Sequence, residues 1–227
     1  MKLLGLIKLN SNIVVIDGLA IGSGRDDIEI GGLDNQVVRN PCNGAPYIPG
    51  SSVKGKMRFL AEWRLGRFNS SKGSVCDCNN EDCEVCRIFG TSQNEHKNGP
   101  TRLLVRDSQL KGEYDPEKQI EIKYSTAINR LTGTAKNGSL RNMERVTPGT
   151  TFYFELVYRF FDTGDNGERD KKLFNVVKKC LKWLENDTLG GSGSRGCGKI
   201  AFREIVLSGL EQGEYPDTDA LLANIPE

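Results

Sequence analysis

The sequence feature that most constrains the fold is a glycine-rich stretch, residues 189–200, which reads L-G-G-S-G-S-R-G-C-G-K-I. Its five glycines disfavour a regular helix or strand, because glycine loses more backbone entropy on folding than any other residue. The stretch therefore predicts an irregular connection between an amphipathic helix and a final strand. Backbone N–H groups in such a turn can bind an anion, to which Arg195 and Lys199 could add charge-assisted contacts. A flexible turn without a ligand is the alternative, and the lysine spacing does not fit a nucleotide-binding fingerprint.

Hydrophobic periodicity predicts the strands of the fold. Residues 3–16 alternate apolar and polar side chains, which is the pattern of a half-buried strand. The apolar face of this strand would carry Ile7, Leu9, Ile13 and Val15. Further strands are predicted over residues 101–110, 152–158 and 200–207.

Two amphipathic helices are predicted between these strands. The first follows Pro49-Gly50, and Ser51 or Ser52 would cap its N-terminus. The second covers residues 173–184, where apolar side chains recur at helical spacing. The order strand, helix, strands, strand, helix, strand suggests a ferredoxin-like α+β core, which is the architecture of the RRM.

Four cysteines within eleven residues predict a metal site. Their spacing, C-x-C-x4-C-x2-C, brings Cys76, Cys78, Cys83 and Cys86 within reach of one tetrahedral Zn²⁺. The total of seven cysteines is odd, which argues against a secreted disulfide framework. His96 is the one histidine of the chain and could replace one cysteine as a ligand. Four protein ligands leave no open coordination position, so the site is expected to be structural.

Length and charge limit the classes of function. A chain of 227 residues fits one domain with insertions, and no apolar run is long enough to span a membrane. The N-terminal apolar run contains Lys8 and has no small-residue cleavage site, so a cytoplasmic location is expected. The formal net charge is only +1. Any contact with nucleic acid must therefore come from a local basic face, which leaves acidic faces for partner subunits.

Two further segments carry basic side chains in patterns that suit RNA. Lys54 and Arg58 lie four residues apart on the first predicted helix, where the helix N-terminus also favours phosphate. A solvated basic helix face is the alternative. Residues 121–146 predict a hairpin, whose polar tip between Gly133 and Gly138 suits an exposed position. An ordinary hairpin with charged edges explains the same periodicity.

Four stretches in the same order resemble the RAMP proteins, which are the RNA-binding subunits of CRISPR interference complexes. They are residues 31–39, 46–58, 123–146 and 189–200, and the similarity is closest to the repeated backbone subunit of type III-A (Csm) complexes. The resemblance implies a single RAMP domain over residues 1–227. It also implies a zinc-binding insertion at about 69–100 and a β-hairpin thumb at about 111–150, which folds over the guide RNA and displaces a base.

The resemblance implies a function. Such a subunit binds crRNA, stacks with further copies of itself along the guide and cleaves complementary target RNA at regular intervals. Its partners would include the other Csm subunits, among them the large polymerase-like subunit and the small subunits, and no membrane. The RNA-binding residues implied are Ser51, Ser52, Lys54, Arg58, Arg130, Arg141, Gly191, Ser192, Gly193, Ser194, Arg195 and Lys199.

Asp34 is the candidate catalytic residue. From the sequence alone, an aspartate after Gly31-Gly32-Leu33 is most simply a turn residue. In the family, the aspartate of this loop is the one required for target cleavage. An unperturbed aspartate, with a pKa of about 3.9, is a poor general base near neutral pH. Asp34 is therefore expected to hold Mg²⁺ or another divalent cation, or to act as a weak base raised by burial.

Three alternatives remain from the sequence. The first is a non-catalytic RNA-binding backbone subunit of a related CRISPR complex. The second is a guide-processing endoribonuclease of the wider RAMP group, a class that usually relies on histidine pairs, whereas this chain has one histidine. The third is a zinc-stabilised protein-interaction module that binds no RNA.

Overall fold

A four-stranded antiparallel sheet forms the core of the computed structural model, which describes residues 1–22, 36–68, 73–78, 80–92 and 98–209. The strand order is β3-β7-β1-β8, formed by Leu103–Val105, Thr151–Asp162, Lys2–Val15 and Ile200–Gly209. The long central strands pair from Lys2 opposite Asp162 to Val14 opposite Thr151. Two helices complete the unit, α1 (Gly50–Arg64) between β1 and β3, and α4 (Glu168–Asn186) between β7 and β8.

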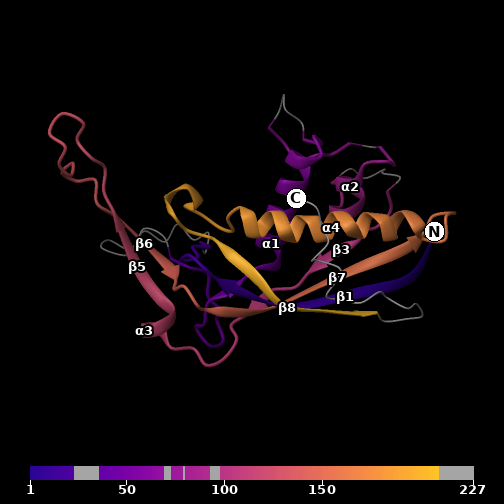
Figure 1. The fold of residues 1–227 in the computed structure, drawn as a ribbon, viewed down its shortest axis with the longest axis horizontal. Coiled ribbons are helices and arrows are strands. Elements are labelled where there is room, and N and C mark those ends of the chain that lie inside the picture. Colours follow the sequence, from indigo (N-terminus) through magenta and orange to yellow (C-terminus); the bar gives the residue numbers. More distant parts are fainter. Residues whose placement is uncertain (23–35, 69–72, 79, 93–97, 210–227) are drawn as a thin grey trace.

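This connectivity is ferredoxin-like, as the sequence predicts. Numbered within the core alone, the strands lie in the order 2-3-1-4, and each helix connects two parallel strands that are not neighbours in the sheet. Both helices lie on one side of the sheet, with α4 running along the length of the long strands (Figure 1). The two helices contact each other as well as the sheet.

Strand alternation decides which side chains enter this core. The side chains of Ile7, Leu9, Ile13 and Val15 are all buried, so the predicted apolar face of the first strand is confirmed. They meet Phe154, Leu156 and Tyr158 of β7 and the apolar face of α4. The buried residues of α4 include Leu173, Phe174, Val177, Cys180, Leu181 and Leu184.

Two local predictions are wrong. Residues 101–110 do not form one strand, because the chain leaves the sheet after Val105 and pairs again as β4 (Ser108–Gln109) with β2 (Tyr47–Ile48). Neither Ser51 nor Ser52 caps α1, whose N-cap is Pro49. The side chain of Asp107 takes this role, since its Oδ1 accepts a hydrogen bond of 2.7 Å from the Gly50 N–H. A carboxylate from a distant segment thus satisfies the helix N-terminus.

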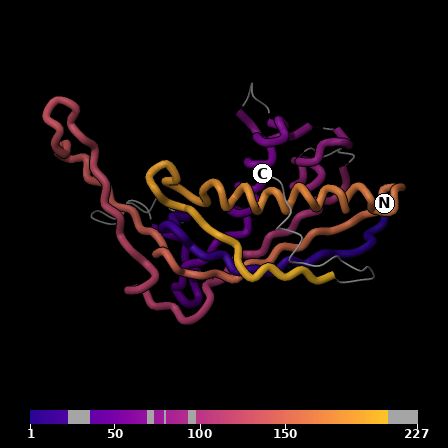
Figure 2. The backbone as a smooth tube through the Cα atoms, viewed as in Figure 1, coloured from indigo at the N-terminus to yellow at the C-terminus, as the bar shows by residue number. Residues whose placement is uncertain are grey.

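A separate two-stranded hairpin projects from the core. It pairs β5 (Ile120–Ser125) with β6 (Arg141–Val146), and the short helix α3 (Pro116–Gln119) precedes it. Its tip extends well away from the sheet and the helices (Figure 2). The root returns to the core through a bridge between Val146 and Leu19. The hairpin is therefore held at one end and exposed at the other.

A buried ionic cluster joins three parts of the core. The carboxylate of Asp170, in the first turn of α4, is fully buried and binds Arg87 at 2.7 Å and Arg102 at 2.9 Å. It also accepts a hydrogen bond of 2.9 Å from the Phe161 N–H of β7. Burial, and then the nearby Asp170 carboxylate, raise the pKa of Tyr158. A buried charge that binds two arginines stabilises the fold only while all three are present.

We expect Asp170→Asn to destabilise the protein strongly. The amide keeps the shape of the side chain but leaves Arg87 and Arg102 buried without a counter-ion, a loss of about 3–5 kcal/mol. Thermal unfolding followed by circular dichroism should show a melting temperature lower by about 6 °C or more. Glu168→Gln is the matched control, because Glu168 lies in the same helical turn but makes a surface ion pair with Lys171. Equal melting temperatures for the two variants would contradict the role assigned to Asp170.

Candidate metal centre and nucleic-acid interface

The four clustered cysteines converge on one point. The Sγ atoms of Cys76, Cys78, Cys83 and Cys86 all lie within 4.8 Å of one another. The closest pairs are 3.6 to 3.8 Å apart. Tetrahedral zinc with Zn–S bonds of about 2.3 Å places its sulfurs about 3.8 Å apart, so the observed separations fit that ion. Cys83 caps α2 (Glu84–Phe89), and its sulfur accepts a hydrogen bond of 3.5 Å from the Cys86 N–H.

Burial and mutual hydrogen bonding set the protonation of the cluster. A hydrogen bond from the Cys86 thiol lowers the pKa of Cys83 to about 5, whereas burial raises the pKa of Cys76 to about 12. The hydrogen bond to Cys83 also raises the pKa of Cys86. Packed thiolates repel one another, so without a cation the cluster can hold only part of its possible negative charge. A bound Zn²⁺ would stabilise the thiolate form of all four cysteines, which would be its ligands.

A second set of contacts attaches the cluster to α1. Glu62 is buried, and its carboxylate accepts a hydrogen bond of 2.9 Å from the Cys76 N–H. Arg58 binds the same carboxylate at 2.9 Å and donates a hydrogen bond of 2.6 Å to the Cys76 carbonyl. Arg58 thus connects α1 to the cysteine cluster. Its guanidinium is already occupied by these groups, which weakens the prediction that it contacts RNA.

The glycine stretch packs tightly against residues 16–20. The Gly191 N–H donates to the Ala20 carbonyl at 2.7 Å, and the Gly198 N–H donates to the Gly18 carbonyl at 3.0 Å. Gly190 has φ of +78°, and a Cβ there would lie 2.3 Å from the Ala20 oxygen. Gly198 has φ of +88°, and a Cβ there would lie 2.2 Å from the Leu189 oxygen. These two positions require glycine, so the stretch is an ordered structural element.

The root of the hairpin binds the same stretch. Lys123 of β5 donates a hydrogen bond of 2.6 Å to the Arg195 carbonyl, which lies in the 3₁₀ helix η1 (Gly193–Arg195). Arg145 of β6 lies close to Cys197, with 3.6 Å between Nη1 and Sγ, and binds Glu121 at 2.8 Å. The glycine stretch and the predicted thumb therefore form one surface, on which the Arg195 side chain is exposed.

The loop that contains Asp34 starts and ends beside this surface. Gly22 and Val37 form a β-bridge, and the Val38 N–H donates to the Ile21 carbonyl at 2.9 Å. Glu144, a buried residue of β6, accepts a hydrogen bond of 2.9 Å from the Val37 N–H and binds Arg39. Asp34 itself lies outside the described residues. The hairpin thus holds the chain three residues after the candidate catalytic position.

The other predicted residues are divided between several places. Lys54 lies 3.5 Å from the Thr101 hydroxyl, and burial, then the charge of Arg58, lower the pKa of Lys54. Arg130 and Arg141 are exposed on the hairpin, and the Lys199 side chain is exposed at the start of β8. Among the described residues, no contact joins Lys54 or Arg58 to the glycine stretch. His96, the alternative zinc ligand, lies outside the described part of the chain.

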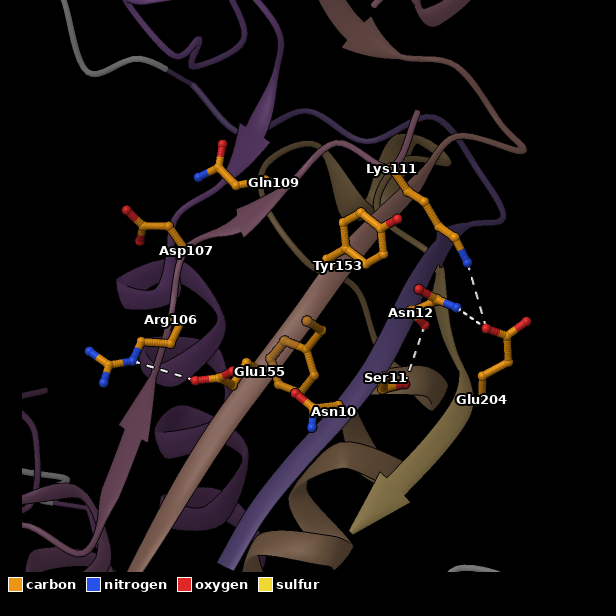
Figure 3. A pocket seen from close by; sticks show the side chains of 11 residues that line it. Asn10, Ser11, Asn12, Arg106, Asp107, Gln109, Lys111, Tyr153, Glu155 and Glu204 are labelled. Carbon is orange, nitrogen blue, oxygen red and sulfur yellow. Dashed lines mark hydrogen bonds and ion pairs between the residues drawn. The ribbon is translucent and has the colours of Figure 1, made fainter. Parts of the chain in front are cut away.

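A shallow groove of about 570 Å³ lies on the sheet face opposite the helices (Figure 3). Asn10 and Asn12 of β1 and Tyr153 of β7 form part of its lining. Its carboxylates are paired, with Glu155 at 3.7 Å from Arg106 and Glu204 at 3.6 Å from Lys111. This mixed charge does not favour a phosphate backbone, and none of the predicted RNA-binding residues lines the groove.

Comparisons with known proteins decide the family. The model of the RAMP superfamily matches residues 12–201. The chain belongs to the RAMP superfamily. Within it, the chain is a homologue of the Csm3 proteins: it is 40% identical over 210 residues to a protein of Methanocaldococcus jannaschii named CRISPR system Cms endoribonuclease Csm3, covering 91% of this chain and 82% of that protein. A protein of the same name from Methanothermobacter thermautotrophicus is 39% identical over 219 residues, covering 88% of this chain and 84% of the relative.

A solved structure supports the same assignment. It is a Csm3–Csm4 subcomplex of the type III-A CRISPR-Cas interference complex, and one of its chains matches with a TM-score of 0.60 and 32% identity. The match covers 92% of this chain and 81% of that chain. The ferredoxin-like α+β architecture with a cysteine-cluster insertion is therefore a Csm3-like fold.

The sequence did not reveal several residues that hold the cysteine cluster, the ends of the Asp34 loop and the hairpin in place. Glu62 and Glu144 are buried carboxylates that position backbone around the cysteine cluster and the Asp34 loop. Lys123 and Arg145 connect the hairpin to the glycine stretch. Their partners lie between 14 and 107 residues away in the sequence. Only Glu62 could have been noticed from the sequence, because it is a charged residue within the apolar pattern of the first predicted helix.

We expect the protein to contain one Zn²⁺ per chain when it is purified under reducing conditions without added metal. Elemental analysis should find it. Cys83→Ser should lose the ion and unfold at a lower temperature, because zinc binding contributes to the free energy of folding. Cys42→Ser is the matched control, since Cys42 is exposed and lies outside the cluster. Reduced wild-type protein that is well folded and free of zinc would exclude a structural zinc site.

Proposed function

We propose that this RAMP protein is the crRNA-binding backbone subunit of a type III-A CRISPR interference complex and cleaves the target RNA paired with the guide. The main observation in support is the similarity of this chain, over most of its own length and that of its relatives, to proteins named as Csm3 endoribonucleases. The connection of the hairpin root to the glycine stretch supports the proposal, since it brings together two of the predicted RNA-binding elements.

Charge supports an RNA path along this surface. Between Ile122 and Met143 the hairpin contains two lysines and two arginines and no carboxylate. The exposed side chains of Arg195 and Lys199 extend the same basic region at the root. Phosphates would bind there without regard to base, and base pairing to the guide would select the target. The proposed RNA contacts also include the backbone of Gly191 to Ser194 and the hydroxyls of Ser51 and Ser52.

The cleavage step would use the 2′-OH of the RNA as the nucleophile. Its oxygen attacks the adjacent phosphorus and the bond from phosphorus to the 5′ oxygen of the next nucleotide breaks. The departing 5′ oxygen takes a proton from water, so a 2′,3′-cyclic phosphate and a 5′-OH result. The hairpin would align this attack by displacing a nucleotide, which lowers the barrier through positioning. We propose that Asp34 accepts the hydroxyl proton or holds a divalent cation such as Mg²⁺. When bound, that cation would stabilise charge on the phosphate.

The proposal extends to assembly. One RAMP domain, residues 1–227, would carry the zinc-binding insertion at about 69–100 and the thumb at about 111–150. Copies would stack head to tail through heterologous contacts, which build a filament along the guide. The Csm3–Csm4 subcomplex supports a Csm4-type neighbour, and we propose the large and small Csm subunits as further partners. No helix among the described residues is long and apolar enough to cross a bilayer, and we propose a cytoplasmic location.

Neutralising the basic root should weaken RNA binding without regard to sequence. Arg195→Ala with Lys199→Ala should lower affinity for every guide alike, and the slope of log K against log salt should fall by about 0.7 for each phosphate that the variant no longer binds. Filter binding at several salt concentrations measures both. Lys172→Ala, an exposed lysine of α4, is the control and should change neither value. A reduction in affinity that depends on the guide sequence would contradict phosphate recognition.

Asp34→Ala should abolish target cleavage while guide binding, assembly and target capture persist. Asp34→Asn should fail nearly as fully, because the amide loses the charge that accepts a proton or holds a cation. Cleavage of labelled target by the assembled complex, resolved on a gel, measures this, and a chelator should stop the wild-type reaction. A target with 2′-deoxy sugars at the cut positions should bind and stay intact. If the Asp34→Ala complex still cleaves target RNA at regular intervals, the catalytic role of Asp34 is wrong and the residue serves only the turn.

A further inference from the structure

The outer side of the helix layer carries a cluster of aromatic side chains, Phe59, Trp63 and Phe68, which we name the aromatic face. Trp183 of α4 is partly buried against the core and is linked to α1 through the Arg64 guanidinium. Trp63 is 60% exposed, Phe59 44% and Phe68 36%. Trp63 stacks on Phe68 with ring centroids 4.8 Å apart and an angle of 18° between the planes, and it lies 5.9 Å from Phe59. Three large apolar rings are therefore held together in contact with solvent.

The position of these rings on α1 is not explained by the core. The buried face of the helix is formed by other residues, among them Val53, Met57 and Leu60. Phe59 and Trp63 are one turn apart on the opposite side, where polar side chains are expected. A contiguous exposed aromatic cluster of this kind marks a surface that something covers.

The rim of the aromatic face is basic. The Lys56 ammonium lies 4.9 Å from the Phe59 ring centroid, and the Arg64 guanidinium lies 5.7 Å from the centroid of Trp183. Lys179, one helical turn before Trp183, has no carboxylate partner among the described residues. Lys56 is already paired with Asp187, with 3.3 Å between Nζ and Oδ1, so Arg64 and Lys179 are the rim cations that the described part of the chain leaves for an acidic ligand. A ligand that suits this face combines apolar side chains with negative charge.

The chain itself contains such a segment. Residues 210–227 carry five Asp or Glu and no Lys or Arg, and include Tyr215, Leu221, Leu222 and Ile225. The segment follows Gly209, the last residue of β8, and the Phe202 N–H seven residues earlier donates a hydrogen bond of 2.8 Å to Glu185 of α4, so the segment must return about 23 Å along the strand to reach that end of α4. Eighteen residues extend at most about 60 Å, which is ample to pass around a helix about 10 Å wide.

We infer that residues 210–227 bind the aromatic face of the same chain. Leu221, Leu222 and Ile225 would cover the exposed rings, and the acidic side chains would lie against the basic rim. Tethering favours this arrangement over a contact between copies, because it gives the segment an effective concentration in the millimolar range. The inference does not depend on RNA binding or cleavage.

The chain has two tryptophans, and Trp63 is the one that belongs to the aromatic face, so its fluorescence reports on that face once Trp183 is replaced. In full-length protein carrying Trp183→Phe, Trp63 is the single reporter, and acrylamide, a neutral quencher, measures its exposure. The triple variant L221S/L222S/I225S should raise the quenching constant by about twofold or more. Asp217→Asn with Asp219→Asn should raise it less, and added salt should reduce the difference, because salt screens the charges. Gln212→Ala is the matched control and should change nothing.

Other outcomes would overturn the inference. Equal quenching in the parent and the triple variant would mean that the segment does not cover the face. Protection of Trp63 that disappears on tenfold dilution would assign the contact to a second copy. If the parent and the triple variant are equally quenched and single-stranded poly(U) protects Trp63, the face is a nucleic-acid surface. Protection that persists on dilution and is absent from the triple variant supports the intramolecular contact.

Discussion

The close approach of the glycine stretch to residues 16–20 is the contact on which the other parts of the proposed RNA surface depend. At Gly190, where φ is positive, a Cβ would lie 2.3 Å from the Ala20 oxygen, and at Gly198 a Cβ would lie 2.2 Å from the Leu189 oxygen within the stretch itself. The same few residues receive the end of β1, the bridge to the hairpin root and the neck of the loop that contains Asp34. The glycine stretch, the hairpin root and residues 16–22, which are distant from one another in the sequence, therefore share one support.

Periodicity was sufficient to predict the core but not its attachments. The alternation of Ile7, Leu9, Ile13 and Val15 and the helical spacing around Val177 report burial directly, so the ferredoxin-like α+β core could be predicted and is confirmed. The capping of α1 by Asp107 could not be predicted, because a polar partner from a distant segment leaves no periodic signal. Of the candidate site, the convergence of the four cysteines is confirmed, whereas Asp34 and the proposed RNA contacts stay predictions.

The cysteine cluster is connected to the core by charged groups and not only by apolar packing. Glu62 and Arg58 attach its first cysteine to α1, and Arg87, next to its last cysteine, enters the buried ionic cluster around Asp170. Buried ion pairs add little net stability compared with apolar packing, but removal of one partner is costly because the other charge stays buried. The described part of the segment around the cysteine cluster is therefore attached to the helix layer by ionic contacts, and none of its described residues forms a strand of the four-stranded sheet.

The projecting hairpin has a consequence for how such a chain can diverge. Lys123, Arg145 and Glu144 fix the part of the hairpin ladder nearest the core, and beyond them the ladder continues through the pairs Tyr124–Asn142 and Ser125–Arg141. Each added pair lengthens the ladder by about 3.4 Å and leaves the root unchanged. The core therefore fixes the base of the hairpin, while the length of the hairpin can change by one residue pair at a time. Evolution can change the distance at which the tip acts without rebuilding the domain that carries it.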